Sequence, residues 1–361
     1  MKSDQSSLLL SKSNQKKSFW IRWNTQTSIW DPSPLRKTIS YILLGLWTLV
    51  CIFPVYWSFI TTFKTFSHFS GGPYYIPFVD FEPSLFAWRI ILEEGFDSTS
   101  LAFLNSIIIS FTSSTIAVFL GSMAGYALAR ITYKPRVGSV LLFVFVTIAV
   151  SVIIGVYSVS WQIAIASGLA IFLLLLLSIG RYFTKTLSNH DIAFWIISTR
   201  VLPPVTVVLP MYVLFQQMGI LKTHWSMIIA YTTGAVPVAV WLMREFFSKI
   251  PVVLEESAII DGASRYRIWW SILLPIVKPG LAATYVLTII ATWNEYLFAL
   301  FLSTANTQTM PILVASQLTV QGTQWWTMSV VILIMVLPVV AVAIYLQRFV
   351  ISGLLSGSVK G

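Results

Sequence analysis

Charged residues are scarce in this sequence. They make up 10% of its 361 residues, whereas hydrophobic residues make up 57%. A soluble domain usually carries about 25% charged residues. This shortfall excludes an ordinary water-soluble protein and indicates that lipid, rather than water, surrounds most of the chain.

Cysteine and histidine are nearly absent, and a nucleotide-binding loop is missing. Cys51 is the single cysteine and lies in an apolar run, which excludes a disulfide framework and a cysteine-based zinc site. The histidines His68, His190 and His224 are isolated and lack the spacing of metal ligands. The phosphate-binding pattern G-x-x-x-x-G-K-S/T does not occur. We therefore expect that the chain binds no ATP, metal or other cofactor itself and is not an enzyme.

Long apolar runs, by contrast, are abundant. About 20 mostly apolar residues cross the roughly 30 Å hydrocarbon core of a bilayer. Eight runs are of about this length: 39–63, 103–129, 139–157, 161–180, 192–215, 225–243, 280–302 and 327–346. The sequence thus predicts an all-α polytopic membrane protein, with a basic tail at 1–38 and a transmembrane domain at 39–361. The tail lacks the pattern of a cleavable signal peptide, so we expect the first run to remain as an anchor.

The basic residues are unevenly distributed between the two sets of loops. All but four of the 23 lie in the tail, near the C-terminus or in loops that follow an even number of predicted spans. The positive-inside rule therefore predicts that both termini and the loop 244–279 are cytoplasmic. Because these residues are scattered at span ends, the net charge of +10 does not indicate a nucleic-acid-binding face.

Two charged residues fall inside predicted spans. Arg200 lies in the fifth span beside Pro203 and Pro204, and Glu295 lies in the seventh. A charge inside the bilayer costs roughly 2.5–3.5 kcal/mol on insertion scales and indicates a functional site by default. A structural ion pair or a water-facing cap would also explain each residue, and the residue pattern leaves these interpretations open.

The second span contains a small-xxx-small pattern. Gly121 and Gly125 are four residues apart and therefore share one helical face. Such a pattern allows another helix to approach closely.

The cytoplasmic loop 244–279 is too polar for lipid and too apolar to remain uncovered. Its first half predicts a short helix with one apolar face, formed by Leu254, Ala258 and Ile259. Glu255 and Glu256 are expected to point elsewhere. Gly262 then breaks the helix, and a second short helix ends before Pro275. The loop therefore predicts a helix-turn-helix along the membrane that offers an apolar side to a partner.

This loop resembles the EAA loop of the permeases of ATP-binding-cassette (ABC) importers. The matching string is Glu256, Ser257 and Ala258, then three residues, Gly262, nine residues, and Ile272 to Pro275. Ser257 replaces the usual alanine, one small residue for another. In that family the loop is a coupling helix that docks into a cleft of the ATP-hydrolysing subunit. The resemblance implies such contacts for Glu255, Glu256, Ser257, Ala258, Asp261, Gly262, Ala263 and Pro275.

Further matches narrow the resemblance to carbohydrate-uptake permeases, and most closely to the maltose-type second permease subunit. The run W-N-E-Y-L-F at 293–298 resembles the span after the loop, and the segment 198–204 resembles the corresponding segment of that subunit. The resemblance covers most of the chain from about Ile39. It implies a multi-pass protein of a bacterial-type cytoplasmic (inner) membrane. Candidates for the translocation pathway are Asn294, Glu295 and Arg200.

The same resemblance implies a set of partners. They are a homologous permease that completes a heterodimer, two cytoplasmic ATPase subunits that bind ATP and Mg, and an extracytoplasmic solute-binding protein. Membrane lipid is expected around the complex, and nucleic acid is not. The implied solute is a sugar, a polyol or a related compound. Two alternatives remain: an ion-coupled secondary transporter that uses Glu295 and Arg200, and a non-transporting scaffold subunit.

Two segments depart from the family pattern. Members usually have six spans, whereas residues 138–190 add what is predicted to be an extra pair, which leaves the sidedness of the loop unchanged. We expect a peripheral, lipid-facing hairpin, with a binding site for another subunit as the alternative. The long tail carries Trp20, Trp23 and Trp30 and is expected to lie on an anionic membrane surface.

Overall fold

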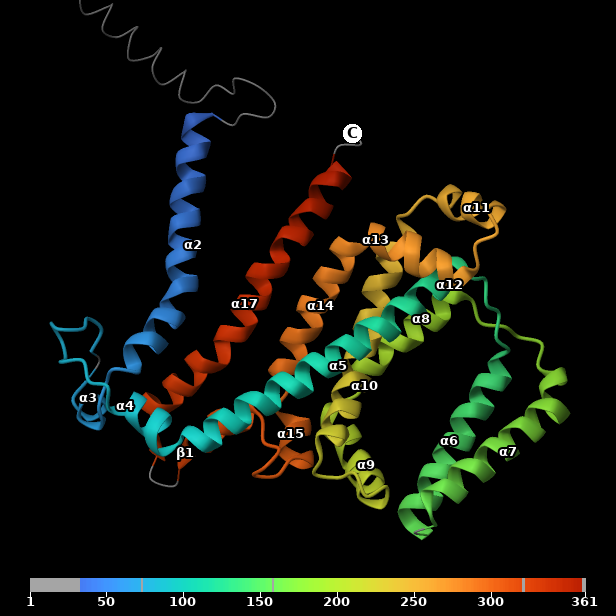
Figure 1. The fold of residues 1–361 in the computed structure, drawn as a ribbon, viewed down its shortest axis with the longest axis horizontal. Helices are drawn as coiled ribbons and strands as arrows, with labels where there is room; N and C mark the ends of the chain where they lie inside the picture. The colour runs from blue at the N-terminus through green and yellow to red at the C-terminus, as the bar shows by residue number, and fades with distance from the viewer. Residues whose placement is uncertain (1–32, 73, 158, 320–321, 359–361) are drawn as a thin grey trace, which may run out of the picture. The chain divides into compact units, whose positions relative to one another are not determined.

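The computed structural model describes residues 33–358 apart from 73, 158 and 320–321. The chain divides into two compact units, Met1–Phe86 and Ala87–Gly361, and each is described here by itself (Figure 1). The predicted membrane contact of the tail, with its three tryptophans, lies outside the described residues.

The first unit is built around one long apolar helix. Helix α2 (Pro34–Thr61) starts with a proline, whose missing N–H would have no helical partner at that position. The short helix α3 (Phe66–Ser70) follows, and its N-terminus is capped by Thr65 together with His68. Lys64 is buried between these helices, where its Nζ donates to the carbonyl of Tyr74 at 2.7 Å. The first predicted span is therefore a single continuous helix.

The second unit is held together by close packing among four long helices: α5 (Phe96–Arg130), α10 (His224–Ser248), α14 (Lys278–Trp293) and α17 (Trp325–Ser358). Helix α5 packs along α10, and α14 packs against both α5 and α17 (Figure 1). Small hydroxyl side chains fill these interfaces, as where the hydroxyl oxygens of Ser114 and Thr292 lie 2.9 Å apart. Such residues let apolar helices associate where lipid provides no hydrophobic driving force.

Gly121 and Gly125 lie where α5 meets α10, as their spacing predicts. A Cβ atom on Gly121 would lie 2.5 Å from the Cβ of Ala239, and one on Gly125 would lie 2.8 Å from the backbone nitrogen of Arg244. Real side chains do not approach this closely. The helix that approaches this small-xxx-small face is therefore α10.

We expect Gly125→Ala to destabilise the protein by about 1–3 kcal/mol, because the methyl group forces two packed backbones apart. The measurement is the midpoint of thermal aggregation of the purified protein in detergent. Gly155→Ala is the matched control, since a Cβ there would meet its nearest neighbour at 3.8 Å. Equal midpoints for the two variants would contradict the packing role of Gly125.

The predicted fifth span is not one continuous helix. The structure divides it into α8 (Asn189–Ser198), the 3-10 turn η3 (Thr199–Val201) and α9 (Pro204–Gln217). The two parts meet at 89°. Pro203 and Pro204 cause the break, because neither has an N–H to donate and each disfavours helical backbone in the residue before it. The span predicted over 192–215 is therefore a bent pair of helices.

The predicted seventh span is also divided. Helix α14 ends at Trp293, and α15 (Leu297–Leu302) follows as a separate helix. Before α14, the chain runs through α12 (Arg265–Arg267), the π-helix η4 (Ile268–Leu273) and α13 (Leu274–Ile276), which meet α14 at 82°. Within the described residues, six helices are long and apolar enough to cross a membrane, or up to eight if each bent pair is one span.

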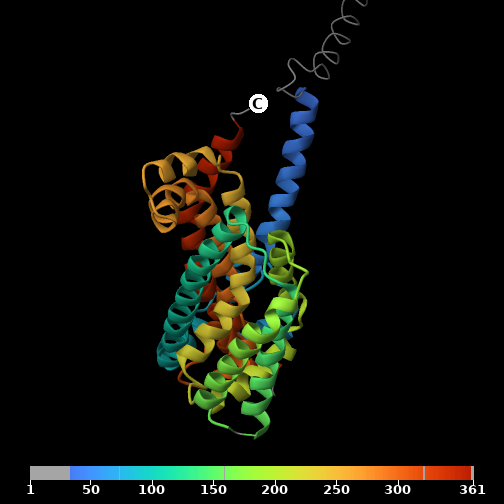
Figure 2. The same cartoon turned by 90° about the vertical axis from the view of Figure 1, so that its right-hand side faces the viewer.

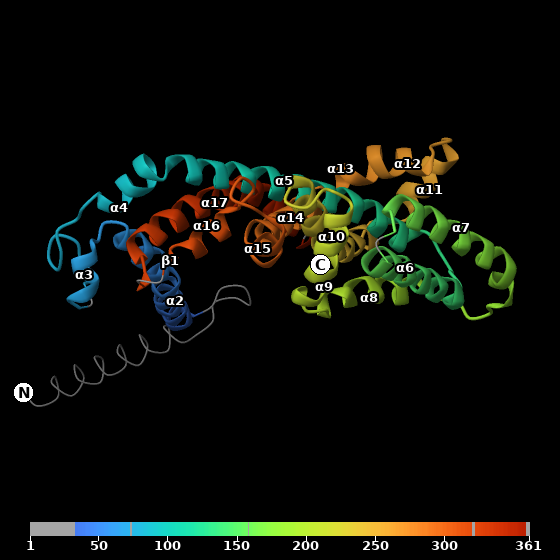
Figure 3. The ribbon, with the colours of Figure 1, turned by 90° about the horizontal axis from the view of Figure 1, so that it is seen from below.

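The extra pair of spans forms a hairpin of α6 (Val137–Tyr157) and α7 (Trp161–Ile179), followed by the turn η2 (Gly180–Tyr182). Figure 3 shows it at the edge of the unit, on the side of α10 away from α17. Its base is closed by backbone pairing, with the N–H of Val137 donating to Lys185 and that of Leu187 donating to Pro135, both at 2.9 Å. Most apolar side chains of the hairpin are exposed, which fits both a lipid-facing insertion and a binding site for another subunit.

The remaining elements lie in the connections: α4 (Phe86–Arg89), the π-helix η1 (Ile90–Glu94), α11 (Val253–Ile260), α16 (Met310–Ser316), and the antiparallel strands β1 (Leu318–Thr319) and β2 (Gly322–Thr323). Figures 1 and 2 show α11 and the C-terminal end of α17 at one end of the second unit, with the turn of the α6–α7 hairpin at the other. The loop and the C-terminal end of α17 thus share a side, as the distribution of basic residues predicts.

Candidate functional site

Helix α11 stands at the tip of the loop that carries the EAA-like string. It ends in a Schellman motif, in which the N–H of Ala263 bonds to the carbonyl of Ala258 at 2.9 Å and that of Gly262 bonds to Ile259 at 3.0 Å. Gly262 adopts φ +77, a left-handed conformation that glycine reaches without steric cost. The string therefore encodes a short helix with a sharply defined end.

An ion pair attaches α11 to the end of α5. Arg130 donates through Nε to Glu255 Oε1 at 2.5 Å and through Nη2 to the carbonyl of Ile250. The hydroxyl of Tyr126, one turn earlier on α5, donates to Glu255 Oε2 at 3.2 Å. The side chain of Glu255 is only 3% exposed and that of Arg130 only 9%. We call these three residues, Tyr126, Arg130 and Glu255, the clamp.

The face expected for α11 is divided in the structure. Leu254 and Ile259 are exposed, as an apolar side offered to a partner requires, whereas Ala258 is buried together with Glu255. The reason is the clamp, because Arg130 provides a buried partner for a carboxylate that local periodicity assigns to the surface. Of the other residues implied by the resemblance, five are exposed and Ala263 is half-buried; the exposed ones are Glu256, Ser257, Asp261, Gly262 and Pro275.

The second half of the loop is anchored by apolar packing. Ile268, Trp269 and Leu273 are buried in a cluster with Met243 and Phe247 of α10. Tyr266 and Trp270 remain exposed on the outer side, with their rings stacked at 6.5 Å. The loop is therefore fixed to the helix bundle at both α11 and η4, and its outer surface carries apolar, acidic and basic side chains, among them Arg265 and Arg267.

We expect Gly262→Ala to destabilise the end of α11 by about 1–2 kcal/mol, the cost of placing a side chain in left-handed backbone. A Cβ there would meet nothing within 4 Å, so the cost is conformational rather than steric. Gly262→Asn should cost less, because asparagine tolerates this conformation. Amide hydrogen exchange of α11 measures both effects, and equal exchange for glycine and alanine would contradict the prediction.

Two of the three predicted pathway residues line one cleft. Arg200, in the turn between α8 and α9, and Glu295, after α14, both line a cavity of about 70 Å³ with Tyr231 of α10. An adjoining cavity of about 280 Å³ shares Arg200, Gly234 and Phe298 with it. Arg200 is exposed and donates through Nη1 to the carbonyl of Gly234 at 3.0 Å. The break in the fifth span thus places Arg200 in the same cleft as Glu295.

Glu295 also has a structural role. Its Oε1 accepts hydrogen bonds from the N–H groups of Leu297 and Phe298, at 3.0 and 3.2 Å, and so caps α15. Asn294 faces a different cavity of about 640 Å³ beside α17, and its side chain donates to the carbonyl of Ile290 at 2.8 Å. The structure therefore brings Arg200 and Glu295 together and separates Asn294 from them.

Sequence reasoning missed two of the three clamp residues. Arg130 was counted among the basic residues that set topology, and Tyr126 was not singled out. Their partner Glu255 is 125 and 129 positions away along the chain, so no local pattern connects them. A basic residue directly after the second predicted span is the only signal that the sequence offered.

These features define a class of protein. A bundle of membrane-spanning helices, with a short loop helix clamped to one end and broken spans lining a cleft, is the architecture of a membrane permease. A solved structure described as a bacterial ABC transporter involved in the import of the acidic polysaccharide alginate contains a chain that aligns with a TM-score of 0.57. The alignment covers 89% of this chain and 99% of that chain at 16% identity. The fold is that of an ABC importer permease.

Sequence comparisons agree with this class. The model of the family described as binding-protein-dependent transport system inner membrane component matches residues 190–355. The probable ABC transporter permease protein y4oR of Sinorhizobium fredii is 29% identical over 87% of this chain and 95% of its own length. The trehalose/maltose transport system permease protein MalG of Thermococcus litoralis is 26% identical over 91% of this chain and 98% of its own length.

The predicted resemblance to carbohydrate-uptake ABC permeases is thereby confirmed. The chain thus has the fold of an ABC importer permease and is similar to multi-pass ABC permeases of the cytoplasmic membrane, from whose usual six spans the extra hairpin of α6 and α7 departs.

Proposed function

We propose that this chain is the subunit of an ATP-driven importer that converts movement of an ATPase subunit into opening and closing of a path for a sugar, a polyol or a related solute. The observation that carries this proposal is the clamp, which fixes an otherwise exposed helix to the end of a long span. An importer needs such a rigid connection between the element that a partner moves and the helices that line the path.

The outer surface of α11 supports the docking step. Val253 and Ile260 are exposed by 66% and 85%, and the carboxylates of Glu256 and Asp261 lie beside them. Exposed apolar groups on a short helix with a defined C-terminal cap favour insertion into a groove of a partner protein. Acidic neighbours add orientation through complementary charges on that partner.

The connection from α11 to the spans supports the coupling step. The clamp joins α11 to α5, and α5 packs along α10 and α14. Glu295 follows α14, and Gly234, the hydrogen-bond partner of Arg200, lies on α10. A displacement of α11 is thus transmitted through packed helices to the cleft that carries Arg200 and Glu295, which we propose as part of the translocation pathway.

The partners follow from this mechanism. We propose two ATPase subunits that hold ATP and Mg, a homologous permease that completes the path as a heterodimer, and an extracytoplasmic solute-binding protein. The relative from Thermococcus litoralis is named for trehalose and maltose transport, which favours a small carbohydrate as the solute. The residues that line the cleft do not indicate which sugar is transported.

Transport by the reconstituted complex tests the proposal. The permease pair and ATPase subunits are placed in liposomes with the solute-binding protein outside, and uptake of radiolabelled maltose, trehalose and sorbitol is measured. We expect uptake of at least one probe only when ATP and Mg are available to the ATPase subunits. Uptake by this chain alone, driven by an ion gradient, would instead establish a secondary transporter. Solute bound between the two permeases would discard the alternative of a scaffold subunit.

A further inference from the structure

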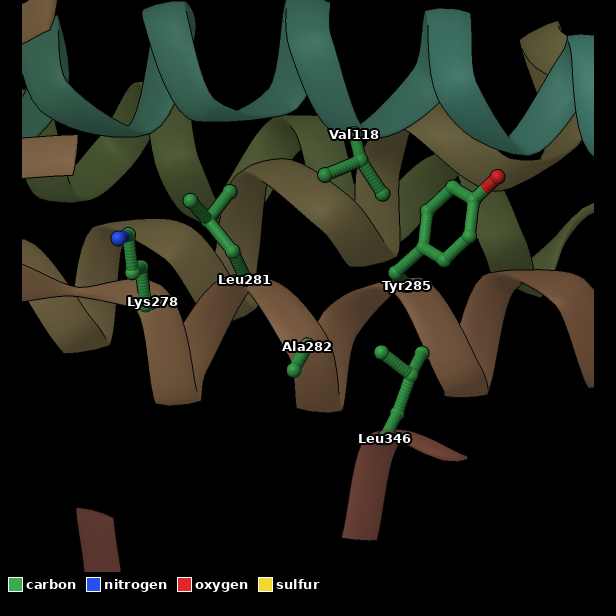
Figure 4. A pocket seen from close by; sticks show the side chains of 6 residues that line it. All are labelled: Val118, Lys278, Leu281, Ala282, Tyr285 and Leu346. Atoms are coloured by element: carbon green, nitrogen blue, oxygen red, sulfur yellow. The ribbon is translucent and has the colours of Figure 1, made fainter. Parts of the chain in front are cut away.

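A groove at one end of the helix bundle contains none of the clamp or cleft residues. It lies between α5, α14 and α17 and has a volume of about 380 Å³. Figure 4 shows four of its side chains arranged along α14, with the other two reaching in from α5 and α17. The six lining residues are Val118, Lys278, Leu281, Ala282, Tyr285 and Leu346.

The wall of this groove is apolar except at one end. The hydroxyl oxygens of Tyr285 and Thr115 lie 3.0 Å apart. The polar atom of Tyr285 is therefore satisfied, and its ring forms part of the apolar wall. Ala282 leaves space between α14 and α17 that a larger side chain would fill. Lys278 is exposed, and among the described residues its ammonium group has no hydrogen-bond or ion-pair partner. The groove thus combines one unpaired cation with a long apolar floor.

Because α14 belongs to the predicted seventh span, we expect the groove that follows it to run along the membrane normal. Lys278 is the first residue of α14 and borders the loop, at the end of the span where headgroups are expected. At a rise of 1.5 Å per residue, Tyr285 lies about 10 Å further along the helix. The groove therefore extends from the level of the headgroups into the hydrocarbon core, with its charge at the water side.

One unpaired cation at the end of an apolar floor suits a phospholipid. A polar solute would find only Lys278 to bind. An anionic phospholipid offers an apolar chain for the floor and a phosphate for the ammonium group, and basic pockets between spans on this side of a membrane bind such headgroups.

We propose that this groove is a binding site for an anionic phospholipid of the leaflet that faces the loop. One acyl chain lies against Leu281, Ala282 and Leu346, and Lys278 holds the headgroup phosphate. Because α14 also precedes the cleft, a bound lipid stabilises the helix that connects the loop to the pathway. This site is independent of the solute and of the ATPase partner.

Native mass spectrometry of the purified complex tests the site. Phosphatidylglycerol and phosphatidylcholine with identical chains are added in turn, and the retained lipid is counted. We expect the protein to retain phosphatidylglycerol about fivefold more tightly, which is the effect of one favourable charge at a membrane surface. Lys278→Gln should abolish this preference and Lys278→Arg should keep it. Ala282→Trp should reduce binding of both lipids by filling the groove.

Lys134→Gln is the matched control, since Lys134 is also exposed and lies on the α5–α6 connection, outside the groove lining. Equal lipid retention by the Lys278→Gln and Lys134→Gln variants would overturn the proposal. Loss of the second permease from the Ala282→Trp complex, with lipid retention unchanged, would also overturn it and assign the groove to a partner helix.

Discussion

Replacing Glu255 by alanine is expected to release α11 from the helix bundle. The change leaves the guanidinium group of Arg130 buried without its carboxylate and removes the acceptor of Tyr126. Breaking one side of a buried ion pair costs about 3–5 kcal/mol. We therefore expect amide hydrogens of residues 253–263 to exchange at least about 100-fold faster, because every 1.4 kcal/mol is a factor of ten.

Transport should fail for the same reason. A released α11 still presents its docking residues, so the ATPase subunits should continue to hydrolyse ATP while uptake falls by at least about tenfold. Such uncoupling distinguishes a connecting role from a docking role. The measurement is the ratio of solute taken up to ATP hydrolysed in the reconstituted complex.

Glu256→Ala is the control for the exchange experiment. Glu256 is the neighbouring glutamate, but its side chain is exposed and carries no ion pair in the described part of the chain. Its loss should leave exchange of α11 unchanged, although it should weaken docking. Equal exchange in the two variants would show that the clamp does not hold α11. A double variant, Glu255→Leu with Arg130→Met, should recover part of the stability, because no charge is then left buried and unpaired.

Replacing Ile260 by aspartate is expected to separate the ATPase subunit from the permease. Ile260 is the last residue of α11 and is 85% exposed, so an aspartate there is tolerated in the isolated chain. In a docked complex it would bury a carboxylate without a partner. Central contacts of this kind are worth about 2–4 kcal/mol. We expect at least a tenfold loss of affinity for the ATPase subunit, measured by co-purification at a series of protein concentrations.

Phe78→Asp provides the matched control for this prediction. Phe78 is also 85% exposed, and it lies in the segment between α3 and α4 of the first unit. The same charge introduced there should leave the ATPase content of the purified complex unchanged. An Ile260→Asp complex that retains ATPase at the same ratio as the Phe78→Asp complex would reject α11 as the docking element.

Much of the architecture follows from short stretches of sequence. The α6–α7 hairpin can be predicted from the sequence, because each helix is a continuous apolar run between polar turns. The end of α11 can also be predicted, because Gly262 can adopt a backbone conformation that other residues avoid. Gly121 and Gly125 indicate a close helix contact through their spacing, but the pattern does not say that α10 makes it.

The broken spans were harder to predict. Prolines inside membrane helices are often tolerated, so Pro203 and Pro204 alone do not distinguish a kink from the 89° turn that the structure contains. The end of α14 depends on Glu295, whose carboxylate caps α15 rather than continuing the preceding helix. Hydropathy does not register either event, because the residues on both sides remain apolar.

The sequence by itself determined that this protein spans a membrane, that its basic residues gather on one side, and that an EAA-like loop interrupts the spans. These properties depend on local composition and on a few spacings within a helix. Only the tertiary structure decided that Glu255 faces inward, that Arg200 and Glu295 share a cleft, and that Lys278 lies at the mouth of an apolar groove. Each of these depends on side chains from different helices, whose packing brings together residues that are far apart along the chain.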